Sequence, residues 1–414
     1  MSSFEEYYNI QKPNSKYFNL EIATISTCSM ACTYCFEGDE LQTKKKQHVD
    51  NIPNIINKIE VLLESNNFNK EYPDGICINF WGGEPTLNLN WNMELIKVLK
   101  SKPYYNRISF FIYTNGFDYT KLTQHLDLFT PTEMITDKIR IQISWDGIDN
   151  GRVDHSSKPT NTRIKDNILK VIRNYNNLNL STKATIQPQE LLRLQEIWEN
   201  HFKLFLEHNA SKYGDRARIT FSPTLNYVDD FDDTDPEYLE AISKQFAIIL
   251  KLEEKFYAKY KFNLFGWFSS NQLNGRQKRL TNCSAGVNIL ALDYDGSFTT
   301  CHGALYSPNK DDFKKLHNIN LSDTKPNFTK KFFESRESVK KNLEYVDNSC
   351  ITCSATTCYK CPIVNIEQLS KDGIDFDVNN YQVRDTRHCS IYKLFGKFDR
   401  IMFGTILPNI NKNK

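Results

Sequence analysis

The sequence lacks a long apolar run, a secretory signal and a large charge of either sign. No segment is long and apolar enough to span a bilayer, and the N-terminal MSSFEEYYNIQKPNSKYFNL is acidic and polar where a signal peptide needs a basic start and an apolar run. The 52 Lys and Arg residues nearly balance 50 Asp and Glu residues, and the formal charge of +2 gives no broad field for nucleic acid or anionic lipid. These absences argue against nucleic-acid and membrane partners and predict a cytoplasmic protein.

Cysteine, in contrast, is abundant. The chain has 414 residues, more than one domain usually contains, and its 11 cysteines are many for a reducing compartment in which structural disulfides rarely persist. Metal or cluster ligation is therefore the leading explanation. Ten of the 11 fall in two groups, Cys28, Cys32 and Cys35 near the start and Cys283, Cys301, Cys350, Cys353, Cys358, Cys361 and Cys389 further on. Only Cys77 stands apart, in an apolar predicted strand, and it is interpreted as a small buried hydrophobe.

The first half of the chain alternates short β-branched and aromatic runs with longer helical patterns, which is typical of βα units around a parallel sheet. Strands are predicted at 17–25, 75–83, 107–116, 139–147, 181–188 and 216–225, with helices at 51–65, 91–100 and 191–209. This order predicts an α/β fold with a partial (β/α)6 TIM-like barrel. The turns WGGEP, YTNG and SWDG then lie at the mouth formed by the C-terminal ends of the strands, where such barrels carry their chemistry.

Four regions are predicted along the chain. The barrel core spans 1–225, a bridging helical region 226–280, a small cysteine-rich domain 281–395 and a tail 396–414. The bridging region begins with the acidic run VDDFDDTDPEY, interpreted as a solvated loop, and continues as a helix that ends near residue 262. After Cys283 the pattern predicts short strands and cysteine-rich loops, so we expect metal rather than an apolar core to organise that domain.

The first cysteine group has the spacing C-x3-C-x2-C directly after the first predicted strand. Three thiolates can hold a four-iron cluster by three corners and leave the fourth iron open for a small ligand. The alternative is zinc, but a structural zinc site usually takes four protein ligands and no fourth Cys or His lies nearby. The motif CSMACTYCFE, with Tyr34 before the third cysteine, resembles the cluster loop of the radical S-adenosylmethionine (SAM) superfamily.

This resemblance implies that SAM chelates the open iron through its amino and carboxylate groups and is cleaved to a 5'-deoxyadenosyl radical. It also implies that Tyr34 lies against the adenine. Gly82, Gly83, Glu84 and Pro85 resemble the GGEP motif of the family, which implies that Glu84 accepts a hydrogen bond from the methionyl amino group. Ser144 in ISWDG matches a serine that contacts the ribose. Relatives often have an arginine a dozen residues later, where this chain has Ser156, and either Arg152 or Arg163 could replace it.

The second cysteine group resembles the SPASM domain that many radical SAM enzymes carry for two auxiliary [4Fe-4S] clusters. The resemblance implies an outer cluster held by Cys350, Cys353, Cys358 and Cys389, and an inner one held by Cys283, Cys301 and Cys361. The inner set is one ligand short, which suggests an open or non-cysteine site on that cluster. A pair of zinc sites is the alternative, because paired C-x2-C units also occur in zinc ribbons.

The resemblance implies a peptide or protein substrate that is oxidatively modified or cross-linked, as in the maturation of ribosomally made peptides. Sulfatase-maturating relatives have an aspartate after the cysteine of G-x4-C, where this chain has His302, interpreted as a proton carrier or a structural group. Formylglycine formation and a small-molecule dehydrogenase activity are therefore alternatives, as is a purely electron-transferring cluster protein. Expected partners are a reductant such as flavodoxin or ferredoxin and, since only 27 residues precede Cys28, a separate leader-peptide-binding protein.

Overall fold

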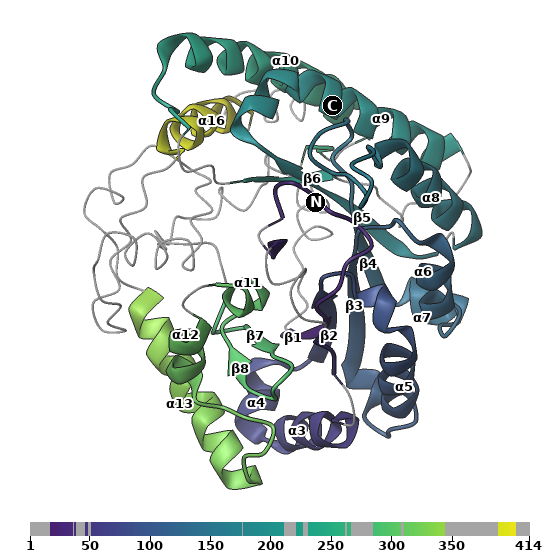
Figure 1. Ribbon diagram of the computed structural model, residues 1–414, viewed down its shortest axis with the longest axis vertical. Helices are drawn as coiled ribbons and strands as arrows, with labels where there is room; N and C mark the ends of the chain where they lie inside the picture. The colour runs from purple at the N-terminus through teal and green to yellow at the C-terminus, as the bar shows by residue number, and fades with distance from the viewer. Residues whose placement is uncertain are drawn as a thin grey trace.

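The computed structural model describes residues 17–35, 37–38, 46–48, 51–175, 177–210, 221–226, 231–260, 263–265, 285–307, 310–343 and 388–402. Within these residues, eight strands form one sheet in the order β6-β5-β4-β3-β2-β1-β7-β8. The sheet curves around a central space, and helices cover its outer face (Figure 1). No helix in the described part of the chain is long and apolar enough to cross a membrane.

The six predicted strands are confirmed as a run of parallel neighbours. They are β1 (Tyr17–Ile25), β2 (Gly75–Gly82), β3 (Ile108–Thr114), β4 (Ile139–Ser144), β5 (Asn179–Ile186) and β6 (Phe221–Leu225). The observed strands end within three residues of the prediction, except at the start of β6, where 216–220 lie outside the described residues. The partial barrel expected from the sequence is therefore the fold of this part of the chain.

Helices follow the strands on the outer face of the barrel. They are α3 (Ile52–Glu64), α4 (Asn66–Glu71), α5 (Leu89–Lys100), α6 (Tyr119–Leu126), α7 (Pro131–Ile135), α8 (Asn161–Asn174) and α9 (Leu194–Ala210), with short 3-10 turns η1 (Pro85–Asn88), η2 (Tyr105–Arg107) and η3 (Pro188–Arg193). Every second strand residue, such as Ile22, Phe80 and Ile112, packs in the apolar core between sheet and helices. Because side chains alternate along a strand, the residues between them face the inside of the barrel.

The opposite face of the same strands lines the barrel lumen and is largely polar. Side chains on this face include Asn19 and Glu21 of β1, Cys77, Asn79 and Trp81 of β2, Arg140, Gln142 and Ser144 of β4, and Ser181 and Lys183 of β5. Branched apolar side chains usually fill a closed TIM barrel. This lumen is lined by amides, hydroxyls and charged groups together with the aromatic rings of Trp81, Phe111 and Tyr113, so it is suited to hold polar ligands.

The chain after Cys283 extends the same sheet, which the sequence did not predict. Strand β7 (Ile289–Leu292) pairs parallel to β1, and β8 (Phe298–Thr299) pairs antiparallel to β7. The helices α11 (His302–Leu305), α12 (Lys310–His317) and α13 (Lys325–Leu343) follow. The expectation of only short strands and loops here was wrong for α13, whose Phe328 and Phe332 pack into the barrel's own core.

At the other end of the sheet, α10 (Pro236–Tyr260) is the predicted bridging helix, and α16 (Cys389–Ile401) packs against it (Figure 1). Apolar side chains of both helices, including Phe246 and Phe395, share one cluster. The acidic run before α10 is not wholly solvated, because Asp233 is buried and its carboxylate accepts a hydrogen bond of 2.8 Å from the backbone N–H of Ser390. A carboxylate at the start of a helix satisfies an otherwise unpaired N–H and complements the helix dipole.

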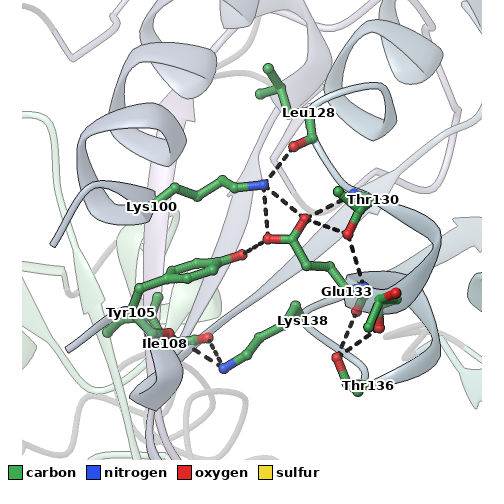
Figure 2. Close-up of polar contacts among 9 residues, drawn as sticks. Lys100, Tyr105, Ile108, Leu128, Thr130, Glu133, Thr136 and Lys138 are labelled. Atoms are coloured by element: carbon green, nitrogen blue, oxygen red, sulfur yellow. Dashed lines mark hydrogen bonds and ion pairs between the residues drawn. The ribbon is translucent and has the colours of Figure 1, made fainter. Parts of the chain in front are cut away.

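An ionic cluster fastens α5 and α7 near the N-terminal end of β4, away from the mouth of the barrel (Figure 2). The Lys100 ammonium lies 2.8 Å from one oxygen of Glu133, to which the Tyr105 hydroxyl also donates at 2.6 Å. Glu133 and Thr130 form a capping box at the start of α7. Burial would raise the pKa of Glu133, but the donors from Lys100, Tyr105 and Thr130 outweigh it and lower the pKa to about 2.

Candidate functional site

The three N-terminal cysteines lie on the loop that leaves the C-terminal end of β1. A segment after β4 holds this loop, because Ala31 N–H donates to the Val153 carbonyl at 2.9 Å and Thr33 N–H donates to the Gly151 carbonyl at 2.8 Å. The His155 ring lies 3.0 Å from the Cys28 carbonyl through Nε2. The loop is therefore fixed at the mouth of the barrel by backbone contacts that do not depend on its thiols.

The thiols of Cys28, Cys32 and Cys35 are partly buried and form no disulfide. Burial raises the pKa of all three, that of Cys35 to about 12, so a positively charged group is needed to hold them as thiolates. Among the described residues, no three Cys, His, Asp or Glu side chains converge as ligands of one metal ion. In a cubane each thiolate binds a different iron, so the three free cysteines of this one loop can supply the ligands of a [4Fe-4S] cluster and leave its fourth iron open.

Gly82 and Gly83 join the end of β2 to the end of β1. Gly82 has a φ of 127°, and a Cβ on it would lie 2.4 Å from the Ile25 carbonyl oxygen, so only glycine fits. Gly83 N–H donates to that same oxygen at 2.8 Å, and Glu84 N–H donates to the Thr27 carbonyl at 2.9 Å. The GGEP turn therefore brings the backbone of β2 directly against the start of the cysteine loop.

The Glu84 side chain is buried and surrounded by donors from the protein. One oxygen accepts from the hydroxyls of Thr86 at 2.7 Å and Thr114 at 2.8 Å, and the other accepts from Asn115 N–H at 2.7 Å. Burial raises the pKa of Glu84 above its ordinary value, and these donors oppose the rise only in part. The carboxylate therefore orients Asn115, whose Nδ2 lies 3.4 Å from Cys28 Sγ. A bond from Glu84 to the SAM amino group stays a prediction, and Pro85 begins the turn η1 behind it.

Tyr34 and Arg152 meet at a carboxylate that the sequence did not single out. The Tyr34 hydroxyl donates to Asp146 Oδ2, and Arg152 donates to both oxygens of Asp146, at 2.9 Å from Nε and 3.2 Å from Nη2. The guanidinium also lies 5.6 Å from the centre of the Tyr34 ring. Burial would lower the pKa of Arg152, but Asp146 outweighs it and raises the pKa. Of the two arginines left open by the sequence, Arg152 is thus beside the cysteine loop.

Arg163 lies elsewhere, on α8, with its guanidinium 3.6 Å from the centre of the Phe117 ring. Ser144 ends β4 on the lumen face and pairs in register with Lys183 of β5. Gly151 makes room for the tyrosine, because a Cβ there would lie 2.9 Å from Tyr34 Cδ1. The structure therefore brings Tyr34, Glu84 and Ser144 to the same end of the sheet, with Arg152 near them.

His302 follows β8 and reaches the lumen side of β1. Its Nδ1 lies 2.8 Å from Glu21 Oε2, and its backbone N–H donates to the same oxygen at 2.7 Å. The imidazole stacks on Trp81 of β2 with 3.7 Å between ring centres, and the Trp81 indole N–H donates to Glu37 at 3.1 Å. Because an ionised carboxylate only accepts, Glu21 fixes the proton of His302 on Nδ1.

Cys77 is fully buried, as predicted, but its surroundings are polar. Its thiol donates to Asn79 Oδ1 at 3.2 Å, and Arg140 Nη2 lies 3.2 Å from its sulfur. The predicted burial is confirmed, and the polar contacts arise because alternate residues of the apolar β2 face the lumen.

Two cysteines of the second group are described. Cys301 directly precedes α11 and Cys389 begins α16. Cys283, Cys350, Cys353, Cys358 and Cys361 lie outside the described residues.

Comparisons with known proteins agree with this geometry. The family model of the radical SAM superfamily matches residues 22–189, whereas a search of curated proteins finds no match. The solved structure of native anSMEcpe with bound AdoMet and a Cp18Cys peptide has a TM-score of 0.63 and 17% identity, covering 96% of this chain and 99% of that one. The native protein with AdoMet alone gives a TM-score of 0.65 at 17% identity, covering 96% and 100%.

Residues 22–189 therefore form a radical SAM domain. The chain is an enzyme that uses SAM for radical chemistry with a catalytic [4Fe-4S] cluster, and its fold is similar to that of anaerobic sulfatase-maturating enzymes.

Proposed function

We propose that this enzyme oxidatively modifies or cross-links a side chain of a peptide or protein. When bound, the catalytic cluster supplies the electron that cleaves SAM to the 5'-deoxyadenosyl radical. The observation that carries the proposal is the polar lumen, which lies on the inner side of the strands whose ends hold the cysteine loop. A substrate side chain that enters it meets His302, Trp81 and Glu21.

The similarity to anSMEcpe supports a peptide as substrate, because that protein has been solved with a peptide bound and this chain covers 99% of it. The SPASM-like cysteines support a second role, the removal of an electron from the substrate after hydrogen abstraction. In this proposal Cys283, Cys301 and Cys361 hold the inner auxiliary cluster, and Cys350, Cys353, Cys358 and Cys389 hold the outer one. Flavodoxin or ferredoxin supplies the reducing electron.

Formylglycine formation is the second candidate, and one contact favours it. The sequence argues against this reaction because His302 stands where sulfatase-maturating relatives have an aspartate. The Glu21 carboxylate lies 2.8 Å from the His302 ring, so a carboxylate from β1 is present beside that position. A His–Glu pair can accept a substrate proton through the imidazole, as a carboxylate does directly.

The test is anaerobic incubation of the reconstituted enzyme with SAM, dithionite and synthetic peptides. We expect 5'-deoxyadenosine in every reaction and, with a true substrate, a peptide that has lost two hydrogen atoms by mass spectrometry. Peptides deuterated at one side chain at a time then identify the carbon that transfers label to 5'-deoxyadenosine. A serine or cysteine that becomes an aldehyde supports the second candidate.

The variant Glu21→Gln tests the contact with His302. We expect fewer modified peptides per 5'-deoxyadenosine, because the imidazole loses its charged partner, and the exposed Glu337→Gln is the matched control. Label transfer from a sugar or alcohol instead of any peptide would contradict the proposal, and absence of SAM cleavage would contradict the whole assignment.

A further inference from the structure

Lys183 is a lumen residue that neither the cysteine loop nor the His302 contacts use. The residues on either side of it in β5, Thr182 and Ala184, are fully buried on the outer face, so the Lys183 side chain extends into the barrel. Lys183 pairs in register with Ser144 of β4 and Ser222 of β6. It therefore stands near the C-terminal ends of the strands, beside the residue expected to contact the SAM ribose.

No hydrogen bond or ion pair to the Lys183 ammonium occurs in the described part of the chain. The charged side chain that acts on it is Glu21, and that carboxylate already accepts two hydrogen bonds from His302 on one oxygen. Burial lowers the pKa of Lys183 below its ordinary value, and the charge of Glu21 opposes this only in part. Lys183 is still partly exposed, so a ligand that fills the lumen would withdraw its ammonium from the remaining water, which is unfavourable unless the ligand places an anion beside it.

We propose that Lys183 binds a carboxylate in the barrel lumen. Two carboxylates are candidates, the methionyl carboxylate of SAM beside Ser144 and an acidic group of a substrate that enters the lumen on the Ser144 side of Lys183, away from Glu21. The second source rests on the proposed peptide substrate, and the first does not. The guanidinium of Arg152 at this end of the sheet is already paired with Asp146, so the single ammonium of Lys183 matches the single charge of a carboxylate better than the double charge of a phosphate.

The first arm of the test compares SAM with decarboxylated SAM, which lacks only the carboxylate. Binding to the anaerobically reconstituted holoenzyme is measured for the wild type and for Lys183→Met, Lys183→Arg and the exposed control Lys97→Met. The open iron also binds the carboxylate, so every variant keeps some preference for SAM, and the comparison is between variants. If the cofactor is the source, the preference of the wild type and the control exceeds that of the methionine variant by about tenfold or more, and arginine keeps part of this difference.

The second arm uses two peptide pools that differ only in carrying Asp and Glu or their amides Asn and Gln. If the substrate is the source, the acidic pool binds the wild-type holoenzyme and the Lys97→Met control more tightly, and Lys183→Met binds both pools equally. Iron content and unfolding temperature of each variant show whether a loss reflects damaged folding.

An effect of Lys183→Met in either arm supports the proposal and identifies the source. Equal discrimination by the wild type and Lys183→Met in both arms overturns it, as does a wild type that discriminates in neither arm. Failure of SAM cleavage by the wild type is a separate result, because it would remove the proposed function and not the carboxylate site.

Discussion

Asp146 is predicted to be the residue that fastens the cysteine loop to the barrel. Its buried carboxylate accepts from the Tyr34 hydroxyl, from Asn150 at 3.0 Å, from two nitrogens of Arg152 and from Thr185 N–H at 2.8 Å. The side chain of Arg152 is only 7% exposed and that of Asp146 only 2%. Loss of the carboxylate would therefore leave a guanidinium inside the protein without its counter-charge.

The variant Asp146→Asn keeps the size of the side chain and removes its charge. Breaking a buried ion pair from one side costs about 3–5 kcal/mol, a large part of the roughly 5–15 kcal/mol that stabilises a typical folded protein. We expect a loss of this size in urea unfolding of the anaerobic holoenzyme. SAM binding should weaken as well, because the single accepting oxygen of asparagine cannot serve Tyr34, Arg152 and Thr185 together.

The neighbouring Asp149 is exposed and provides the matched control, since Asp149→Asn should change stability by less than about 0.5 kcal/mol. In the double variant with Arg152→Met, the cost should be smaller than the sum of the two single costs, because no unpaired charge remains. If Asp146→Asn costs no more than Asp149→Asn, the reasoning about the buried pair is refuted.

Three further changes test other parts of the structure. Cys32→Ala should lower the iron content and abolish 5'-deoxyadenosine formation, measured by chromatography after dithionite reduction. Gly82→Ala should also reduce the iron content and the formation of 5'-deoxyadenosine, since the Cβ of the alanine would lie 2.4 Å from the Ile25 carbonyl oxygen that the turn must approach. Glu133→Gln should cost about 1–2 kcal/mol at pH 7. Because the pKa of Glu133 is lowered to about 2 from an ordinary value near 4.5, this difference should be complete above pH 4.5 and vanish as the pH falls towards 2, as followed by unfolding at each pH.

Each of these three predictions has a result that would contradict it. Retained SAM cleavage by Cys32→Ala would exclude the thiol as a required cluster ligand. Normal iron content in Gly82→Ala would show that the turn can move away from β1. A Glu133→Gln difference that is unchanged down to pH 2 would mean that the ionic cluster of α5 and α7 does not stabilise the protein through the charge of that carboxylate.

The parallel strands and the cysteine loop could be predicted because their signals are local. The apolar alternation of β1 and the spacing of Cys28, Cys32 and Cys35 are complete within short stretches of sequence. The same holds for the GGEP turn, whose need for glycine at position 82 follows from one close approach between neighbouring strands.

The contacts around these motifs could not be predicted, because they join residues far apart in the sequence. Glu21 and His302 are 281 positions apart and meet only because β7 pairs with β1. Asp146 lies in the turn SWDG, where aspartate also occurs for purely local reasons. Its hydrogen bonds to Tyr34 and Arg152 could therefore not be recognised from the sequence. For Gly151, nothing in the sequence indicates that Tyr34 packs against it.

The parallel pairing of β7 with β1 makes the radical SAM domain dependent on a later part of the chain. A fragment that stopped before Ile289 would leave the backbone of β1 as an unpaired sheet edge, directly below the loop that carries the cysteines. Such an edge invites pairing with other chains and aggregation. We therefore expect a fragment limited to the segment matched by the family model to aggregate, and a shortened enzyme intended for expression should retain the β7–β8 hairpin.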